Sequence, residues 1–152
     1  VTKDTPNKKW NGDFGCYDNK LTSLQYCPTE VGGNFLCNNN NLTSLQYCPT
    51  EVGGNFQCYN NNLTSLQYCP TEVGGDFLCS GNPELKQGII HIFNCELGGK
   101  FNFDKGLVDE AVNRIIHDNN YSIAQKKALF MVAMRNAYKE TGNDKYLNYC
   151  KD

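Results

Sequence analysis

The residues with the most obvious chemical potential in this 152-residue chain are nine cysteines and two histidines. Thiolates and imidazoles bind zinc, and each can serve in nucleophilic catalysis. The chain has no Cys-x-x-Cys pair and no Cys/His cluster with zinc spacing, and the odd cysteine count disfavours a complete disulfide framework. We therefore predict no metal and no cofactor.

Seven of the cysteines recur at two fixed registers instead. The first register holds Cys16, Cys37, Cys58 and Cys79, and the second holds Cys27, Cys48 and Cys69. A small thiol is a common buried residue. The pattern therefore predicts two packed columns of cysteine in a protein that resides in a reducing compartment.

The cysteine registers belong to a repeat of 21 residues. Blocks 21–41, 42–62 and 63–83 each begin LTSLQYCPTEVGG and are identical at sixteen of twenty-one positions. A fixed period of this length is the signature of a solenoid. WNGDFGC at 10–16 and LGGKFNF at 97–103 continue the register on both sides.

Each repeat contains one clear strand signal. Phe35 and Cys37 alternate as residues on one face of a strand do. The register predicts five parallel strands, near 13–17, 34–38, 55–59, 76–80 and 100–104. At about 4.8 Å between strands, such a sheet is only about 20 Å across.

An asparagine follows each strand cysteine by three places, at Asn19, Asn40, Asn61 and Asn82. With the apolar spacing around it, the repeat resembles the leucine-rich repeat family, in its short 21-residue bacterial and bacteriophage type. The resemblance implies a right-handed α/β solenoid with a parallel sheet on its concave face and extended segments behind. In that fold the asparagine amide is expected to satisfy backbone groups at the bend after the strand.

The remaining segments read as caps, giving a solenoid over 1–104 and a helical cap over 105–152. An N-terminal cap is expected at about 1–12, where Trp10 covers the first turn, and a helical insertion at about 83–94. Helices are expected at 107–118 and from the capping box at Ser122 to about 140, where Gly142 can end the helix, with a further turn or two at 144–150. The segment 128–134, ALFMVAM, is apolar almost all round. It either packs under the last helix or forms a homodimer.

The five positions at which the repeats differ suggest a partner surface. Three of them are outward-pointing residues of the strands, whereas other exposed positions have not drifted. Either surface drift or adaptation to a partner explains this, and we favour a protein partner bound on the concave sheet. The expected contact residues are Asp13, Tyr17, Asn34, Leu36, Asn38, Asn55, Gln57, Tyr59, Asp76, Leu78, Ser80 and Asn102. The repeated Tyr26, Tyr47 and Tyr68 fit either self-stacking or a second binding strip.

Other functional classes have less support. A net charge of −2 gives the chain no electrostatic reason to bind nucleic acid or an anionic membrane. His91 and His117 fall in predicted helices without a nucleophile at a recognisable spacing. The ending Cys150-Lys151-Asp152 is similar to the Cys-x-Asp of bacterial ligases that carry this repeat type, but the large helical domain of those enzymes is missing around it.

We therefore expect a non-catalytic protein-interaction module, a bacterial or phage effector or inhibitor located in the cytoplasm of the bacterial or infected cell. The sequence leaves secretion open. The alternative is a structural self-association module that uses the C-terminal helices.

Overall fold

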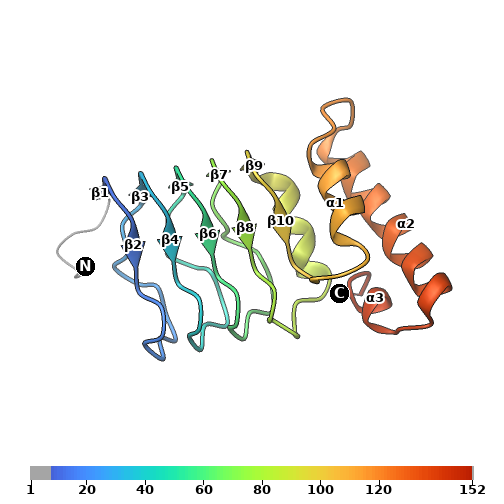
Figure 1. The fold of residues 1–152 in the computed structure, drawn as a ribbon, viewed down its shortest axis with the longest axis horizontal. Helices are drawn as coiled ribbons and strands as arrows, with labels where there is room; N and C mark the ends of the chain where they lie inside the picture. Colours follow the sequence, from blue (N-terminus) through green and yellow to red (C-terminus); the bar gives the residue numbers. More distant parts are fainter. Residues whose placement is uncertain (1–7, 152) are drawn as a thin grey trace.

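The computed structural model describes residues 8–151, and the chain winds through them as a parallel β-solenoid followed by helices (Figure 1). Residues 1–7 of the expected N-terminal cap lie outside the described residues. Each coil contributes two strands of two residues. Sheet A contains, in spatial order, β1 (Lys9–Trp10), β3 (Glu30–Val31), β5 (Glu51–Val52), β7 (Glu72–Val73) and β9 (Glu96–Leu97). Sheet B contains β2 (Phe14–Gly15), β4 (Phe35–Leu36), β6 (Phe56–Gln57), β8 (Phe77–Leu78) and β10 (Phe101–Asn102).

Sheet B confirms the five predicted parallel strands, which pair in the 21-residue register, so that Phe35 lies opposite Phe56. Sheet A was not predicted. Each of its central strands buries one apolar residue, such as Val52 beside the exposed Glu51, and so shows no alternating pair like Phe35 and Cys37. The Gly-Gly corners between the two sheets let successive coils approach closely: a Cβ on Gly53 would collide with the Gly32 carbonyl oxygen.

The core consists of columns of identical side chains, one from each coil. Phe14, Phe35, Phe56, Phe77 and Phe101 form one column, with successive ring centroids 5.8, 5.6, 4.9 and 5.6 Å apart. The predicted cysteine columns run beside it, with Cys37, Cys58 and Cys79 fully buried. All nine cysteines lie among the described residues and form no disulfide. Burial of these repeated apolar columns is what holds the coils together.

The asparagine after each strand bonds to the backbone as predicted. The Nδ2 of Asn61 donates to the carbonyl oxygens of Cys58 and Cys37, each at 3.1 Å, and its Oδ1 accepts from Leu42 N at 3.0 Å. Asn40 and Asn82 repeat these bonds in the coils on either side. Asn19, in the first coil, differs because it is exposed and donates to Tyr17 O.

One helix lies before the last pair of strands, and the others follow the last strand at one end of the solenoid (Figure 1). The helical segment expected at about 83–94 is a 3-10 helix, η1 (Gln87–Asn94), that buries Ile89, Ile92 and Phe93. The three helices expected after residue 104 are α1 (Asp109–Ile116), α2 (Ile123–Thr141) and α3 (Lys145–Asn148). The capping box of Ser122 and Gln125 opens α2, and Gly142, at φ 69°, ends it.

Candidate protein-binding surface

The outer face of sheet B carries three rows of side chains that cross the coils, and the predicted contact residues belong to them. The first row is a hydrogen-bonded ladder. Asp13 Oδ1 accepts from Asn34 N, and Asn34 Oδ1 accepts from Asn55 N, both at 2.7 Å. Asn55 and Asp76 continue the pattern at 2.8 Å. The variation between Asn and Asp here keeps an acceptor oxygen in each coil, so structure rather than a partner accounts for it.

The second row is Gly15, Leu36, Gln57, Leu78 and Asn102. Because alternate residues of a strand face opposite sides, these positions point outward between the buried phenylalanine and cysteine columns. Leu36, Gln57 and Leu78 are half-buried. Within residues 8–151 their side chains form no hydrogen bond, so no structural requirement explains the change from leucine to glutamine and back.

The third row contains the predicted contact residues Tyr17, Asn38, Tyr59 and Ser80, which differ in their exposure. Tyr17 is 49% exposed and Tyr59 is half-buried, as a contact residue requires. Asn38 and Ser80, predicted as contacts, are only 6% and 5% exposed. In the register of sheet B, Asn38 lies between the coils that carry Tyr17 and Tyr59, and Ser80 lies between those that carry Tyr59 and Asp104.

A cavity of about 340 Å³ lies where this face meets α1. Its lining residues are Asp76, Leu78, Lys100, Phe101, Asn102, Asp109, Glu110 and Asn113. Three of them, Asp76, Leu78 and Asn102, were predicted as contact residues. The second row of side chains therefore leads directly into a cavity that α1 closes on one side.

Helix α1 closes the open edge of sheet B with polar side chains. Asn113 pairs with both backbone groups of Phe101: its Oδ1 accepts from Phe101 N, and its Nδ2 donates to Phe101 O, each at 2.7 Å. Asp109 accepts from Asp104 N at 3.1 Å and from Lys105 N at 3.2 Å. The Asn113 side chain therefore makes the two hydrogen bonds that the backbone of a neighbouring strand would make at this edge.

His117 extends this polar row by one more turn of the helix, because its Nε2 lies 2.7 Å from the carbonyl oxygen of Gly99. The apolar pattern of residues 107–118 predicted only the buried face of the helix, and not the polar row of Asp109, Asn113 and His117. The spacing of four residues places these three side chains on one face of the helix, and this spacing is the sequence signal that could have identified the row.

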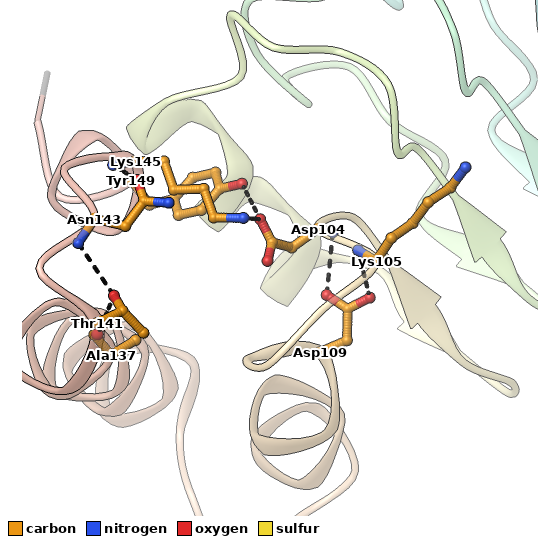
Figure 2. Close-up of polar contacts among 8 residues, drawn as sticks. All are labelled: Asp104, Lys105, Asp109, Ala137, Thr141, Asn143, Lys145 and Tyr149. Carbon is orange, nitrogen blue, oxygen red and sulfur yellow. Dashed lines mark hydrogen bonds and ion pairs between the residues drawn. The ribbon is translucent and has the colours of Figure 1, made fainter.

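A buried carboxylate joins the solenoid to the last helix (Figure 2). The Asp104 side chain is only 4% exposed, and its Oδ1 accepts from Tyr149 OH at 3.0 Å and lies 3.2 Å from Lys145 Nζ. Its Oδ2 has no partner among the described residues. Burial and the nearby Asp104 charge raise the pKa of Tyr149, which keeps the phenol protonated as a donor. Burial also raises the pKa of Asp109, although its N–H donors oppose the change.

A separate set of exposed tyrosines, the tyrosine row, lies on the turns that precede the strands of sheet A. Tyr26, Tyr47 and Tyr68 are 42%, 53% and 56% exposed, and their φ angles are 74°, 73° and 71°. None of the aromatic ring pairs found within residues 8–151 joins two of them. Self-stacking therefore does not explain why tyrosine recurs at this left-handed position, where glycine or asparagine would cost less.

The segment 128–134 packs only partly within the chain. Phe130 and Met134 are fully buried, and Phe130 contacts the rings of Phe93, Phe103 and Tyr149. Val132 is 49% exposed on the other side of α2. Phe130 and Met134 are thus intramolecular core, whereas Ala128 and Val132 of the same segment are exposed.

The residues considered for catalysis have structural contacts. The backbone carbonyl of His91 is 3.8 Å from Cys69 Sγ, and His117 bonds to Gly99. Cys150 is half-buried, and burial raises the pKa of its thiol, which lowers the thiolate fraction at neutral pH. Asp152 lies outside the described residues.

Within residues 8–151 no helix is long and apolar enough to span a membrane. No family model, curated protein or solved structure matches the chain.

Proposed function

We propose that this protein is a non-catalytic interaction module that binds a partner protein on the outer face of sheet B. In this proposal the solenoid is a short leucine-rich repeat of the bacterial or phage type, it acts as an effector or inhibitor, and the cavity beside α1 receives an anchoring side chain of the partner.

The main support is the pattern of differences between otherwise identical repeats. Two of the five variable positions have structural explanations. Asn34, Asn55 and Asp76 all provide the ladder acceptor. Asn39, Asn60 and Gly81 all have a left-handed backbone, at φ 57°, 55° and 73°, which asparagine and glycine adopt readily.

On the sheet, these constraints leave two variable sets unexplained: the second row, and the third-row position occupied by Asn38, Tyr59 and Ser80. Leu36, Gln57 and Leu78 face outward, and Leu78 lines the cavity. With Tyr17 and Tyr59 beside them, they form a mixed apolar and polar patch with aromatic anchors, which is typical of protein interfaces.

The experiment is affinity capture from lysates of bacterial or phage-infected cells, followed by titration of the recovered partner. Truncation of a central anchor typically costs about 2 kcal/mol, or roughly thirtyfold in affinity. We expect a loss of this size for Tyr59→Ala and for Leu78→Ser.

Gln46→Ala and Tyr47→Ala are matched controls, because both change exposed residues on the turns before sheet A. They should bind the partner as the unchanged protein does. If Tyr47→Ala loses affinity while Tyr59→Ala and Leu78→Ser retain it, the sheet B proposal is wrong and the tyrosine row is the binding surface.

A further inference from the structure

The cavity beside α1, where that helix meets sheet B, has an acidic wall. Three of the residues that line its volume of about 340 Å³ are the carboxylates Asp76, Asp109 and Glu110, and one, Lys100, is a cation. Asp76 precedes β8, whereas Asp109 and Glu110 form the start of α1. The solenoid and the capping helix therefore bring the same sign of charge to one cavity.

The three carboxylates retain acceptor capacity for a ligand. Asp76 accepts from Lys100 N through Oδ1 at 2.8 Å, and within residues 8–151 its Oδ2 accepts no hydrogen bond. Asp109 accepts one backbone N–H on each oxygen, which leaves a second lone pair on each. Glu110 forms an ion pair with Arg114 at 3.6 Å, but its side chain is 84% exposed. Because such an exposed pair is weak, Glu110 is available to a ligand as well.

The lining side chains offer fewer donors than acceptors. Asn113 donates through Nδ2 to Phe101 O and to Asp109 O, both at 2.7 Å, so both of its N–H groups are used. Lys100 and Asn102 are the lining side chains that keep donors for a ligand, and Lys100 is exposed. Its single ammonium is outnumbered by three carboxylates. The lining therefore favours a positively charged ligand over a negatively charged one.

The rest of the lining is apolar. Leu78 is half-buried on the outer face of sheet B, and Phe101, in the next strand, is buried. A side chain that fills the cavity thus needs an apolar stem that ends in a cation. Lysine and arginine both have this form. Arginine fits better, because its planar guanidinium presents five donors that bond more than one carboxylate at once.

We propose that the cavity beside α1 binds an arginine side chain of the partner protein. The guanidinium bonds to the carboxylates of Asp109 and Glu110, and the aliphatic stem packs on Leu78. This inference rests on the proposed function for the existence of the partner, and it adds the chemistry of the anchor. Arginine is one of the residues that most often contribute a large share of the binding energy at protein interfaces.

The first test uses a probe that does not require the partner. N-acetyl-arginine methylamide is titrated into the isotope-labelled full chain, and the NMR signals of the backbone amides of Phe101, Asn102 and Glu110 are followed. N-acetyl-citrulline methylamide is the matched control, because its urea group has nearly the same shape and no charge. We expect saturable shifts with the arginine probe and about tenfold weaker binding of the citrulline probe. Equal binding of the two probes, or no saturable shift at these residues with millimolar arginine probe, would overturn the proposal.

Variants of three exposed residues test the sign of the charge effect. Glu110→Gln removes a carboxylate and should weaken binding of the arginine probe by roughly fivefold, whereas Lys100→Gln removes the competing ammonium and should strengthen it by a similar factor. Arg114→Gln is the matched control, since it breaks the same ion pair as Glu110→Gln and keeps the carboxylate. It should not weaken binding. The opposite signs for Glu110→Gln and Lys100→Gln would show that the cavity takes an anion.

The captured partner separates this inference from the proposed function. If Leu78→Ser weakens binding of the partner but Glu110→Gln does not, the partner binds sheet B without an arginine anchor, and this inference alone fails. If the arginine probe binds with the expected charge dependence while Tyr59→Ala and Leu78→Ser bind the captured partner normally, the proposed function fails and the preference of the cavity for arginine stands.

Discussion

At the scale of single residues, the buried asparagines explain how a coil with strands of only two residues holds its shape. Each Nδ2 bonds carbonyl oxygens of two coils, and each Oδ1 accepts an N–H from the coil before it. The bends after the strands would otherwise leave these backbone groups buried without partners. The same side chain therefore serves the coil it belongs to and the contact with its neighbour.

Asn61 and its exposed neighbour Asn62 allow a matched test. Asn61→Ala leaves Leu42 N without its partner, whereas the carbonyl oxygens of Cys37 and Cys58 keep their bonds from Asn40 and Asn82. Because a buried group left unpaired costs about 1–3 kcal/mol, we expect Asn61→Ala to lower the free energy of unfolding by about 2 kcal/mol. Asn62→Ala should change it by less than about 0.5 kcal/mol. Urea unfolding measures both, and equal effects would show that the bonds of Asn61 contribute no special stability.

The residue scale also shows what the sequence could predict of the site. The alternation of Phe35 and Cys37 was enough to place Leu36 and Asn38 on the outer face of the sheet. It could not predict that Asn38 is buried, because alternation along one strand does not show how the side chains of adjacent coils pack against it. The ladder from Asp13 to Asp76 was missed for a similar reason: the acceptor and the donor are 21 residues apart.

At the scale of elements, the C-terminal helices act as an end cap whose polar row matches the edge of sheet B. Sequence patterning predicted a capping helix at 107–118, but not that Asn113 would pair with Phe101 as a strand would. Helical periodicity shows which residues share a face, but it does not show which backbone groups that face meets.

Asn113→Ala tests this capping role. The change leaves the N–H and C=O groups of Phe101 unpaired at the sheet edge, so we expect a loss of about 2 kcal/mol in unfolding free energy. An exposed strand edge also promotes association between chains, which light scattering detects. The control is Arg114→Ala, which removes only the exposed ion pair with Glu110 and should have little effect. An Asn113→Ala variant as stable and as monomeric as Arg114→Ala would contradict the capping role.

Helix α2 is the element on which the self-association alternative depends. Because Phe130 and Met134 are buried within the chain, we expect light scattering to show a monomer at micromolar concentration. If a dimer is found instead, Val132→Asp is the informative variant, since Val132 is exposed and its replacement leaves the core intact. A dimer that Val132→Asp dissociates, with the helix content retained, would favour self-association over the partner proposal.

At the scale of the whole molecule, the repeat aligns one thiol after another along the core. Burial raises the pKa of six of them above the usual value of about 8.5. These are Cys37, Cys48, Cys58, Cys69, Cys79 and Cys95. For Cys69 and Cys95 the raised pKa is about 12. The contribution of these six thiols to the stability of the core therefore depends on pH.

The sign of that dependence follows from linkage. In the unfolded chain these thiols lose their protons near pH 8.5, whereas in the folded chain they keep them until about pH 12 or above. Their contribution to stability is therefore complete below about pH 8.5 and is lost as the pH rises toward the folded pKa. Each thiol adds at most about 1.4 kcal/mol per pH unit, so six together give a slope of about 8 kcal/mol per pH unit.

We therefore expect a steep alkaline unfolding transition between about pH 9 and pH 11, because a total stability of about 5–15 kcal/mol is exhausted within one or two pH units at that slope. Urea unfolding at pH 7, 9 and 10 in the presence of a reductant measures it. Cys58→Ala is the control: it is less stable at every pH, but its stability should fall less steeply between pH 9 and pH 10, by about one proton, or about 1.4 kcal/mol. The same unfolding free energy at pH 7 and pH 10 would show that the cysteine columns do not keep their protons in the folded core.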